Sequence, residues 1–516
     1  MNPGYDPDMR SSVAVALVVV WGLGLAAADG PAISTDNLRT HLQYLSSDEM
    51  RGRANGSPEL ERAAEYIAQQ FESAGLRPGG VNGWFQPFEV IAGLVVGQGN
   101  QLSFSASGKT VTFALGMSYY PLGTPATGSL ARLEALDVVF GGYGISATDL
   151  NYDDYAGLNV QGKAVVIFSH EPQERRANSR LNGTRPLAQT TLEAKAAAAR
   201  DRGAKLLIVI GDPTHGIDQA DYGLFAQDPD ADAADIPVLR VRRKEAQPLV
   251  DAFGLDTRAR RIDDDLVPRS GPLMGAKISY TENLAKNRRT VRNVVGVLPG
   301  SETALRDQAI VIGAHYDHVG VGGHLSVSPE RVGQIHNGAD DNASGTSAII
   351  EMARVAAADK SRFPRSLVFV AFAGEERGLL GSAHYTTVPP IPIDGTWAML
   401  NLDMVGRAGG SVDVSGLEVS PSMEQDLKAA SKAVGSLGIR REGPGAGRSD
   451  DSSFLDRRVP AINFFTGFHG DYHRPSDDWE RVDLPGTSQV ATLALELAAS
   501  LSARDTKPEF VPAVQK

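Results

Sequence analysis

The feature that most constrains this chain is an alternation of apolar strand-like runs with helical stretches between about residues 285 and 505. Strands are predicted over 309–313, 367–372, 398–402 and 461–465, and a helix over 343–357. Strands that alternate with helices are typical of a parallel sheet covered by helices. We therefore expect an α/β fold with a mostly parallel central sheet.

The composition excludes several kinds of site. The 516 residues include no cysteine, so the chain has no disulfide, thiolate nucleophile or iron–sulfur cluster. Any bound metal must be held by histidine and carboxylate side chains. There are 62 Asp and Glu against 50 Lys and Arg. This acidic excess argues against a nucleic-acid partner, whose binding requires basic surface.

The N-terminus is typical of an export signal. Residues 13–25 are apolar, and the alanines at 26–28 resemble a cleavage site. Translation from Met9 would place Arg10 in a normal basic start. We predict a signal peptide over 1–28 and a periplasmic or secreted protein without a stable membrane span after cleavage. The alternative is an uncleaved N-terminal anchor.

The rest of the chain divides by local pattern. Ser57 and Pro58 are typical of a helix start, and apolar residues follow at helical spacing as far as Gly75. A region rich in short β-runs interrupts the α/β pattern and is predicted to be an inserted module. The predicted domains are a discontinuous catalytic domain over 36–118 and 263–505, an insert over 119–262 and a loose tail over 506–516.

Polar side chains follow each predicted strand of the α/β region. They are His315, Asp317, Glu375, Glu376, Asp403 and, in the loop beyond the last strand, His473. The carboxyl ends of parallel strands meet at one edge of the sheet, where ligands bind. Each signal is weak alone, because such residues are ordinarily surface charges or helix caps. Together they predict one shared site.

These residue types suit a pair of divalent metals. Such a pair needs a bridging carboxylate, nitrogen or oxygen ligands on each side, and a further carboxylate that moves a proton. The adjacent Glu375 and Glu376 allow one ligand and one proton carrier. Asp317, two residues after His315, is expected to orient that imidazole.

The motifs that carry these residues resemble the co-catalytic zinc exopeptidases of metallopeptidase family 28, which include bacterial aminopeptidases, glutamate carboxypeptidase and the transferrin receptor. They are AHYDHVG, NGADDNASGTSA, FAGEERGLLGS, NLDMVGR and DYHRPSDDWERVD. The earlier segments YLSSDEMRGRANGS and GWFQPFEV are also similar. The insert, with VVFGGYGI and AKLLIVI, resembles a protease-associated domain. The resemblance implies the zinc exopeptidase fold with that β-rich domain inserted.

The resemblance also implies roles for individual residues. His315 and Asp403 are expected to bind one zinc ion, and Glu376 and His473 the second. Asp341, rather than Asp340, is expected to bridge them, because it lies four residues before the motif glycine Gly345. Glu375 is the expected general base and Tyr472 is expected to help bind the tetrahedral intermediate. The segment Arg448-Ser449-Asp450-Asp451 departs from the Ser-Asp-His of many relatives, so the role of this loop stays open.

The implied function is a zinc-dependent exopeptidase with two Zn²⁺ per chain and peptide substrates. An aminopeptidase using a two-metal, bridging-water mechanism is favoured by the net acidity. A carboxypeptidase stays open, because Arg407, Arg448 and Arg474 lie near the motifs. A glutaminyl-cyclase-type acyltransferase and a non-catalytic receptor-like relative also stay open. The insert either roofs the site or is passive, and the oligomeric state is not determined by these patterns.

Overall fold

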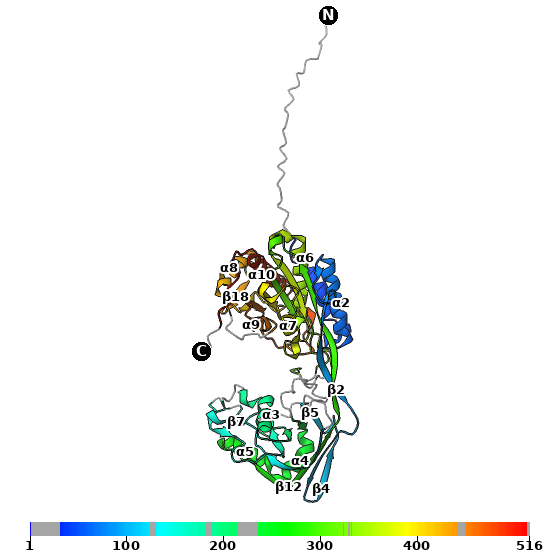
Figure 1. Cartoon of the computed structure of the whole chain (residues 1–516), viewed down its shortest axis with the longest axis vertical. Helices are drawn as coiled ribbons and strands as arrows, with labels where there is room; N and C mark the ends of the chain where they lie inside the picture. Colours follow the sequence, from blue (N-terminus) through cyan, green and yellow to red (C-terminus); the bar gives the residue numbers. More distant parts are fainter. Residues whose placement is uncertain are drawn as a thin grey trace.

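The computed structural model describes Met1 and residues 31–512, apart from 124–130, 175, 177, 182–187, 215–235, 323–324, 329–330, 332 and 442–448. Apart from Met1, the expected signal segment lies outside the described residues. Within those residues, no helix is both long and apolar enough to cross a membrane. Figure 1 shows two bodies, and each is built on its own sheet.

The first body contains a sheet with nine strands among the described residues. Their order is β1 (Arg77–Pro78), β13 (Leu284–Leu298), β15 (Ser366–Phe372), β14 (Ala309–His315), β16 (Thr396–Leu402), β19 (Ala461–Phe465), β17 (Ser411–Ser415) and β18 (Gly438–Arg441), with β2 (Phe85–Val96) paired to β13. The central strands β15, β14, β16 and β19 run parallel. The predicted parallel centre of the sheet is therefore confirmed, and β19 has the predicted bounds. The sheet as a whole is mixed, because β13 and β17 pair antiparallel with β15 and β19.

Helices cover both faces of this sheet, which explains why its central strands are apolar without alternation. Ile310 and Ile312 point to one face, where they pack in a core with α1 (Thr35–Leu45), α2 (Pro58–Ser73), α6 (Gly345–Ala358) and α10 (Leu484–Ser502). Val311 points to the other face, toward α7 (Leu380–Tyr385) and α9 (Asp451–Leu455). Helix α8 (Glu424–Ala430) packs against α10.

The helix predicted after Ser57 is α2, and its start is confirmed. The Ser57 hydroxyl accepts a hydrogen bond from the Leu60 amide at 3.1 Å, as expected of an N-cap. The predicted apolar positions Leu60, Ile67 and Phe71 are buried. The helix ends at Ser73, and Gly75 follows with a φ of +83°, a conformation that favours glycine.

The second body contains a sheet with eight strands among the described residues. Their order is β4 (Lys109–Phe113), β3 (Gln101–Ala106), β12 (Gly271–Glu282), β6 (Ala131–Phe140), β9 (Ala164–Phe168), β10 (Leu206–Ile210), β11 (Val238–Val241) and β5 (Tyr119–Gly123). Its helices are α3 (Leu192–Asp201), α4 (Arg243–Phe253) and α5 (Leu255–Asp265), and β7 (Ser146–Ala147) pairs with β8 (Tyr152–Asp153).

This second sheet is wider than the predicted insert over 119–262. Strands β3, β4 and β12 lie outside those bounds, yet β12 pairs with both β3 and β6. The predicted boundary followed a change in local composition, whereas the true edge depends on pairing between segments far apart in the sequence. The β-rich character is as expected, and the protease-associated identity of this body stays a prediction.

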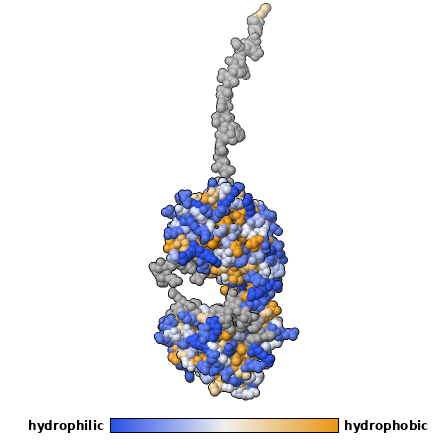
Figure 2. Space-filling model, in the orientation of Figure 1, coloured by the Kyte–Doolittle hydropathy of each residue, from blue (hydrophilic) through white to orange (hydrophobic). Residues whose placement is uncertain are grey.

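Each body has an apolar interior of its own. The strands β14, β15 and β16 contribute to the cores of the first body, and β9, β10 and β12 contribute to those of the second. Figure 2 shows that hydrophilic residues cover much of the visible face of both bodies, with hydrophobic residues scattered among them. Such a division is expected when each body buries its own apolar side chains.

A long two-stranded ribbon connects the two bodies (Figure 1). Strands β2 and β13 pair antiparallel from Phe85 opposite Val294 to Val96 opposite Leu284. The Gly97 amide then donates to the Asn283 carbonyl at 2.8 Å. The chain therefore enters and leaves the second body at adjacent points.

The C-terminal tail is less loose than predicted. The Lys507 ammonium donates to the Asp394 carbonyl at 2.9 Å, and the Val511 amide donates to the Val419 carbonyl at 2.7 Å. Backbone and side-chain hydrogen bonds therefore tie residues 506–512 to the first body, while 513–516 lie outside the described residues.

Candidate metal centre

The predicted site residues lie together at the carboxyl edge of the parallel strands. His315 is the last residue of β14, and Asp403 directly follows β16. Glu375 and Glu376 form a 3-10 turn after β15, and His473 lies in the loop after β19. Asp341 is in the irregular turn that precedes α6. The predicted convergence on one edge is therefore confirmed.

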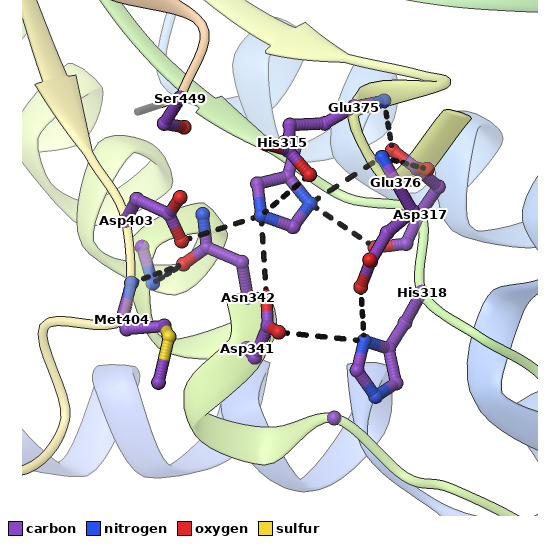
Figure 3. Close-up of polar contacts among 12 residues, drawn as sticks. His315, Asp317, His318, Asp341, Asn342, Glu375, Glu376, Asp403, Met404 and Ser449 are labelled. Carbon is purple, nitrogen blue, oxygen red and sulfur yellow. Dashed lines mark hydrogen bonds and ion pairs between the residues drawn. The ribbon is translucent and has the colours of Figure 1, made fainter. Parts of the chain in front are cut away.

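A first group of carboxylates surrounds the imidazole of His315 (Figure 3). Its Nε2 lies 3.3 Å from Asp341 Oδ1, 3.3 Å from Asp403 Oδ1 and 3.9 Å from Glu375 Oε2. His315 is 1% exposed, so these carboxylates meet it away from solvent.

A second group surrounds His473. Its Nε2 lies 3.1 Å from Asp341 Oδ2 and 3.1 Å from Glu376 Oε2. The two oxygens of Asp341 therefore face different groups, Oδ1 toward His315 and Oδ2 toward His473. This is the arrangement that a carboxylate bridging two cations requires.

Both histidines turn the same nitrogen toward the centre. His315 Nδ1 lies 3.2 Å from the Asp317 carbonyl oxygen, and His473 Nδ1 lies 2.6 Å from the Leu325 carbonyl oxygen. Nδ1–H donates to each carbonyl, so Nε2 is the ring nitrogen that could bind a metal once it has lost its proton. His473 Nε2 is buried, and its near neighbours are the two carboxylate oxygens of Asp341 and Glu376.

The structure corrects the expected contact of Asp317. Its carboxylate lies 3.8 Å from His315 Nδ1, and its backbone carbonyl orients that ring instead. The carboxylate accepts hydrogen bonds from the Glu375 amide at 3.2 Å, the Glu376 amide at 3.3 Å and Asn55 Nδ2 at 2.7 Å. Asp317 therefore holds the turn that carries both glutamates. Sequence spacing suggested the imidazole but could not reveal a turn from another strand.

Asp340 and Asp341 have different environments. Asp340 Oδ1 accepts hydrogen bonds from the Gly406 amide at 2.6 Å and the Ser344 hydroxyl at 3.1 Å. Its Oδ2 lies 3.0 Å from His469 Nε2. Asp340 thus ties neighbouring loops together, and Asp341 is the residue that faces the centre.

Asp477 supports this turn from the loop of His473. One carboxylate oxygen accepts the amides of Asp340 at 2.9 Å and Asp341 at 3.1 Å. Its other oxygen lies 3.1 Å from the Arg407 guanidinium. The bridging position and the His473 loop are therefore held by one buried carboxylate. Sequence analysis missed this residue, because a single Asp in DYHRPSDDWERVD carries no distinguishing signal.

His318 and Arg53 were also missed, although both lie in motifs that were recognised. His318 Nδ1 is 2.7 Å from Glu376 Oε1. Arg53 is fully buried, and its guanidinium donates to the carbonyls of Tyr316 at 2.8 Å, Asn337 at 2.9 Å and Gly338 at 3.0 Å, as well as to that of Leu45. The second histidine of AHYDHVG was the available signal for His318.

The centre opens into a cavity of about 330 Å³. Its lining consists of His315, Asp341, Glu375, Glu376, Asp403, Met404, Phe465, Phe468, Tyr472 and His473. The Tyr472 ring stacks on that of His473 with centroids 3.9 Å apart, and Phe468 packs edge-on against Tyr472 at 5.0 Å. Charged groups and an aromatic wall therefore share one cavity.

Burial and mutual charge shift the pKa values in opposite directions. Burial alone would lower the pKa of His473, but Glu376 and Asp341 outweigh it and raise the pKa to about 11. Burial opposes ionisation of Glu376, yet His473 dominates and lowers its pKa to about 2. For Glu375, burial reinforced by Asp403 outweighs His315 and raises the pKa well above its usual range.

The loop that departs from Ser-Asp-His adds buried acid near the centre. Asp450 and Asp451 are 0% and 6% exposed, and Asn401 donates to the Ser449 hydroxyl at 2.9 Å. Burial raises the pKa of Asp450 to about 7 and that of Asp451 to about 8, and the negative charge of neighbouring carboxylates adds to this effect. Arg448 lies outside the described residues.

Comparison with known proteins finds a family model that matches the part of the chain carrying the centre. Residues 293–498 match the family model for peptidase family M28. Aminopeptidase YwaD of Bacillus subtilis is 28% identical over 240 residues, which cover 44% of this chain and 48% of YwaD. A probable zinc metalloprotease of Pyrenophora teres f. teres is 36% identical over 118 residues, which cover 23% of each chain. The chain thus spans about half or less of these curated relatives.

A solved structure has the same fold over nearly the whole chain. The aminopeptidase from Aneurinibacillus sp. strain AM-1 aligns with a TM-score of 0.58 at 22% identity, covering 93% of this chain and 96% of that one. At this identity the likeness concerns the fold, and it extends over both bodies.

Proposed function

Because residues 293–498 match the model of peptidase family M28, we propose that this protein is a zinc-dependent aminopeptidase that removes N-terminal residues from peptides. One observation carries the proposal. The two oxygens of Asp341 face separate histidines, at 3.3 Å for His315 and 3.1 Å for His473. Each histidine has a further carboxylate beside it, Asp403 or Glu376. This symmetry supports two Zn²⁺ per chain.

The side chains of the centre fit zinc in their chemical type and in the orientation of their ligand atoms. Imidazole nitrogen and carboxylate oxygen are its usual ligands when cysteine is absent. The buried Nε2 of His473 lies 3.1 Å from oxygens of both Asp341 and Glu376, so its lone pair could bind a metal that these carboxylates also hold. His315, Asp403 and Asp341 would hold one ion, and His473, Glu376 and Asp341 the other. Bound zinc supplies a Lewis acid that stabilises negative charge on the scissile carbonyl oxygen.

Glu375 is the proton carrier in this proposal. It lines the cavity but lies 3.9 Å from His315 Nε2, farther than the proposed ligands Asp341 and Asp403 at 3.3 Å each. Its carboxylate takes a proton from the attacking water and delivers it to the departing amine nitrogen. Burial raises the pKa of Glu375 above its usual range in the metal-free protein. The Asp317 contact to its amide fixes its position.

Tyr472 is proposed to bind the tetrahedral intermediate. Its ring stacks on His473, and the residue lines the cavity. Burial, reinforced by nearby carboxylates, raises the pKa of its phenol, which therefore keeps its proton at neutral pH. A neutral hydroxyl can donate a hydrogen bond to a developing oxyanion.

The lining of the cavity, as far as the chain is described, includes no lysine or arginine that could bind a substrate carboxylate. Arg407 Nη2 lies 3.1 Å from Asp477 and 3.4 Å from Asp471, so its charge is already paired. Arg474 Nη1 donates to the Ser328 hydroxyl at 2.6 Å. A carboxypeptidase needs a cationic side chain that can pair with the terminal carboxylate of the substrate. These contacts support cleavage at the amino end.

A substrate panel tests the proposal. We expect cleavage of amino-acyl amides and unblocked peptides, no cleavage of N-acetylated peptides, and loss of activity when a chelator removes metal. Elemental analysis should find two zinc ions per chain. Cleavage of N-blocked peptides from their C-terminus would support the carboxypeptidase. Pyroglutamate formation with one zinc would support the acyltransferase, and absence of any turnover would support a receptor-like role.

We further propose that the protein is exported through the segment at 13–25, which lies outside the described residues. The apolar run and the alanines at 26–28 support a cleaved signal. N-terminal sequencing of the mature protein should find a start near Asp29. A mature chain that begins before residue 20 would instead support the anchor.

A further inference from the structure

His318 lies at the centre but is arranged differently from the other two histidines. It is 1% exposed, and its ring meets that of His473 edge-on with centroids 5.4 Å apart. Its Nδ1 is 2.7 Å from Glu376 Oε1 and 3.9 Å from Asp341 Oδ2. The nitrogen nearest the centre is thus Nδ1 (Figure 3), whereas His315 and His473 present Nε2.

The ring nitrogen that points away from the centre, here called the outer nitrogen, distinguishes a histidine that binds a metal from one that donates a hydrogen bond to a metal ligand. An imidazole that binds a metal keeps a proton on its other nitrogen, and that N–H is nearly always bonded to an acceptor. The outer nitrogens of His315 and His473 both face carbonyl oxygens. His318 Nε2 is buried and has no hydrogen-bond partner among the described residues. A buried N–H without an acceptor is costly, so the proton of a neutral His318 belongs on Nδ1.

The backbone fixes the ring in this orientation. The His318 amide donates to the Arg53 carbonyl at 3.2 Å. Gly338 packs against the ring so closely that a Cβ there would lie 2.4 Å from His318 Cδ2, and its φ is +60°. The Arg53 guanidinium holds the carbonyl of that glycine at 3.0 Å. The ring therefore has little freedom to turn away from Glu376.

We propose that His318 is a positioning residue that makes Glu376 bind zinc through one oxygen only. Nδ1–H donates to Oε1, which leaves Oε2, the oxygen 3.1 Å from His473 Nε2, to face the ion. With Oε1 drawn toward His318 by this hydrogen bond, binding of the ion through both oxygens of Glu376 is disfavoured, and a coordination position stays available for water or substrate. This inference rests on the proposed zinc site.

The test compares two variants that differ in a single donor. His318→Phe keeps a ring but removes the hydrogen bond. His318→Asn keeps an N–H donor near the position of Nδ1. Zinc affinity is measured by competition with a chromophoric chelator, and coordination is followed by the visible absorption of the Co²⁺-substituted protein. We expect His318→Phe to lose about 10–100-fold in affinity at one of two metal sites and to change the cobalt spectrum. His318→Asn should restore both.

Two results would overturn the inference. If His318→Asn fails like His318→Phe, with both variants folded by circular dichroism, the imidazole itself is needed and His318 is a ligand. If His318→Phe binds both metals like the wild type, the hydrogen bond has no positioning role. His473→Asn serves as the control. His473 is a proposed zinc ligand, so an amide in its place should not restore zinc affinity.

Metal content and peptide cleavage of the wild-type protein test the proposed function independently of the His318 variants. A wild-type protein that binds two metals but cleaves no amino-acyl substrate overturns the function and leaves this inference to be decided by metal affinity. A wild-type protein that binds no divalent metal overturns both.

Discussion

At the scale of single residues, Asp340 and Asp341 are neighbours with separate tasks. Asp341→Asn should lose at least one metal, because a neutral amide is a poor bridge between two cations. Asp340→Asn should keep both metals and instead lower the unfolding free energy by roughly 1–3 kcal/mol, since it disturbs buried hydrogen bonds to Gly406 and His469. Elemental analysis and denaturant titration measure the two effects. Equal metal loss in both variants would contradict the assignment of the bridge.

Glu375 and Glu376 form a second matched pair. Glu375→Gln should retain both metals while turnover falls by about 10²–10⁴-fold, the usual contribution of a general acid–base group. Glu376→Gln should lose metal, because Oε2 of Glu376 lies beside His473. Metal content and kcat are measured on the same preparations. Full activity of Glu375→Gln would refute its role as proton carrier.

The histidine pKa values predict how metal binding depends on pH. In the metal-free protein, Glu376 and Asp341 outweigh burial and raise the pKa of His473 to about 11, so zinc must displace a proton near neutral pH. The pKa of His315 is also raised, by Glu375 and Asp403 against burial. Each displaced proton makes the apparent affinity fall about tenfold per unit decrease in pH. Chelator competition between roughly pH 6 and 8, corrected for chelator protonation, should give a slope of one to two. A flat profile would mean that both histidines are already neutral.

At the scale of elements, Arg53 joins the N-terminal helices to two segments that carry site residues. Its guanidinium donates to the carbonyls of Tyr316, Asn337 and Gly338. Tyr316 directly follows His315, and the other two residues precede Asp341. Arg53→Met would remove these hydrogen bonds and deprive the buried carbonyls of Tyr316 and Asn337 of their guanidinium donor, and it should cost roughly 3 kcal/mol or more of unfolding free energy.

The neighbouring Arg51 provides the control for this prediction. Arg51 is exposed, and Arg51→Met should change the unfolding free energy by less than about 0.5 kcal/mol. Urea titration followed by circular dichroism measures both variants. Similar midpoints for Arg53→Met and the wild type would contradict the role of the buried guanidinium.

At the scale of the whole molecule, the β2–β13 ribbon makes the second body a removable insertion. Val96 pairs with Leu284, and the Gly97 amide donates to the Asn283 carbonyl. Replacing residues 98–282 by a two-residue hairpin turn should therefore leave a folded first body that still binds metal. Deleting only 119–262 should instead give an aggregating protein, because β3, β4 and β12 lose most of their sheet. Gel filtration and metal analysis distinguish the two.

The same shortened protein decides what the second body does. If it roofs the site, the shortened protein should accept longer peptides than the wild type does. An unchanged length preference would assign the second body a passive role. The comparison uses peptides of graded length with one N-terminal residue.

Much of the fold and site followed from local signals in the sequence. Apolar runs and helix caps predicted the parallel sheet, α2 and β19, because burial on both faces and capping leave short-range patterns. The positions of His315, Asp341, Glu375, Glu376, Asp403 and His473 followed from strand ends and motif order. The roles of these residues remain predictions, which the metal and kinetic measurements test.

Tertiary structure alone decided which partners these residues have. The carboxylate of Asp317 holds the glutamate turn and not the imidazole two residues away, because a turn from a neighbouring strand lies closer to it. His318, Asp477 and Arg53 act through groups from other segments, and the second sheet extends beyond its compositional limits through long-range pairing. Periodicity and caps are properties of neighbouring residues, so a sequence displays them directly. Hydrogen bonds between distant segments exist only after the chain has packed.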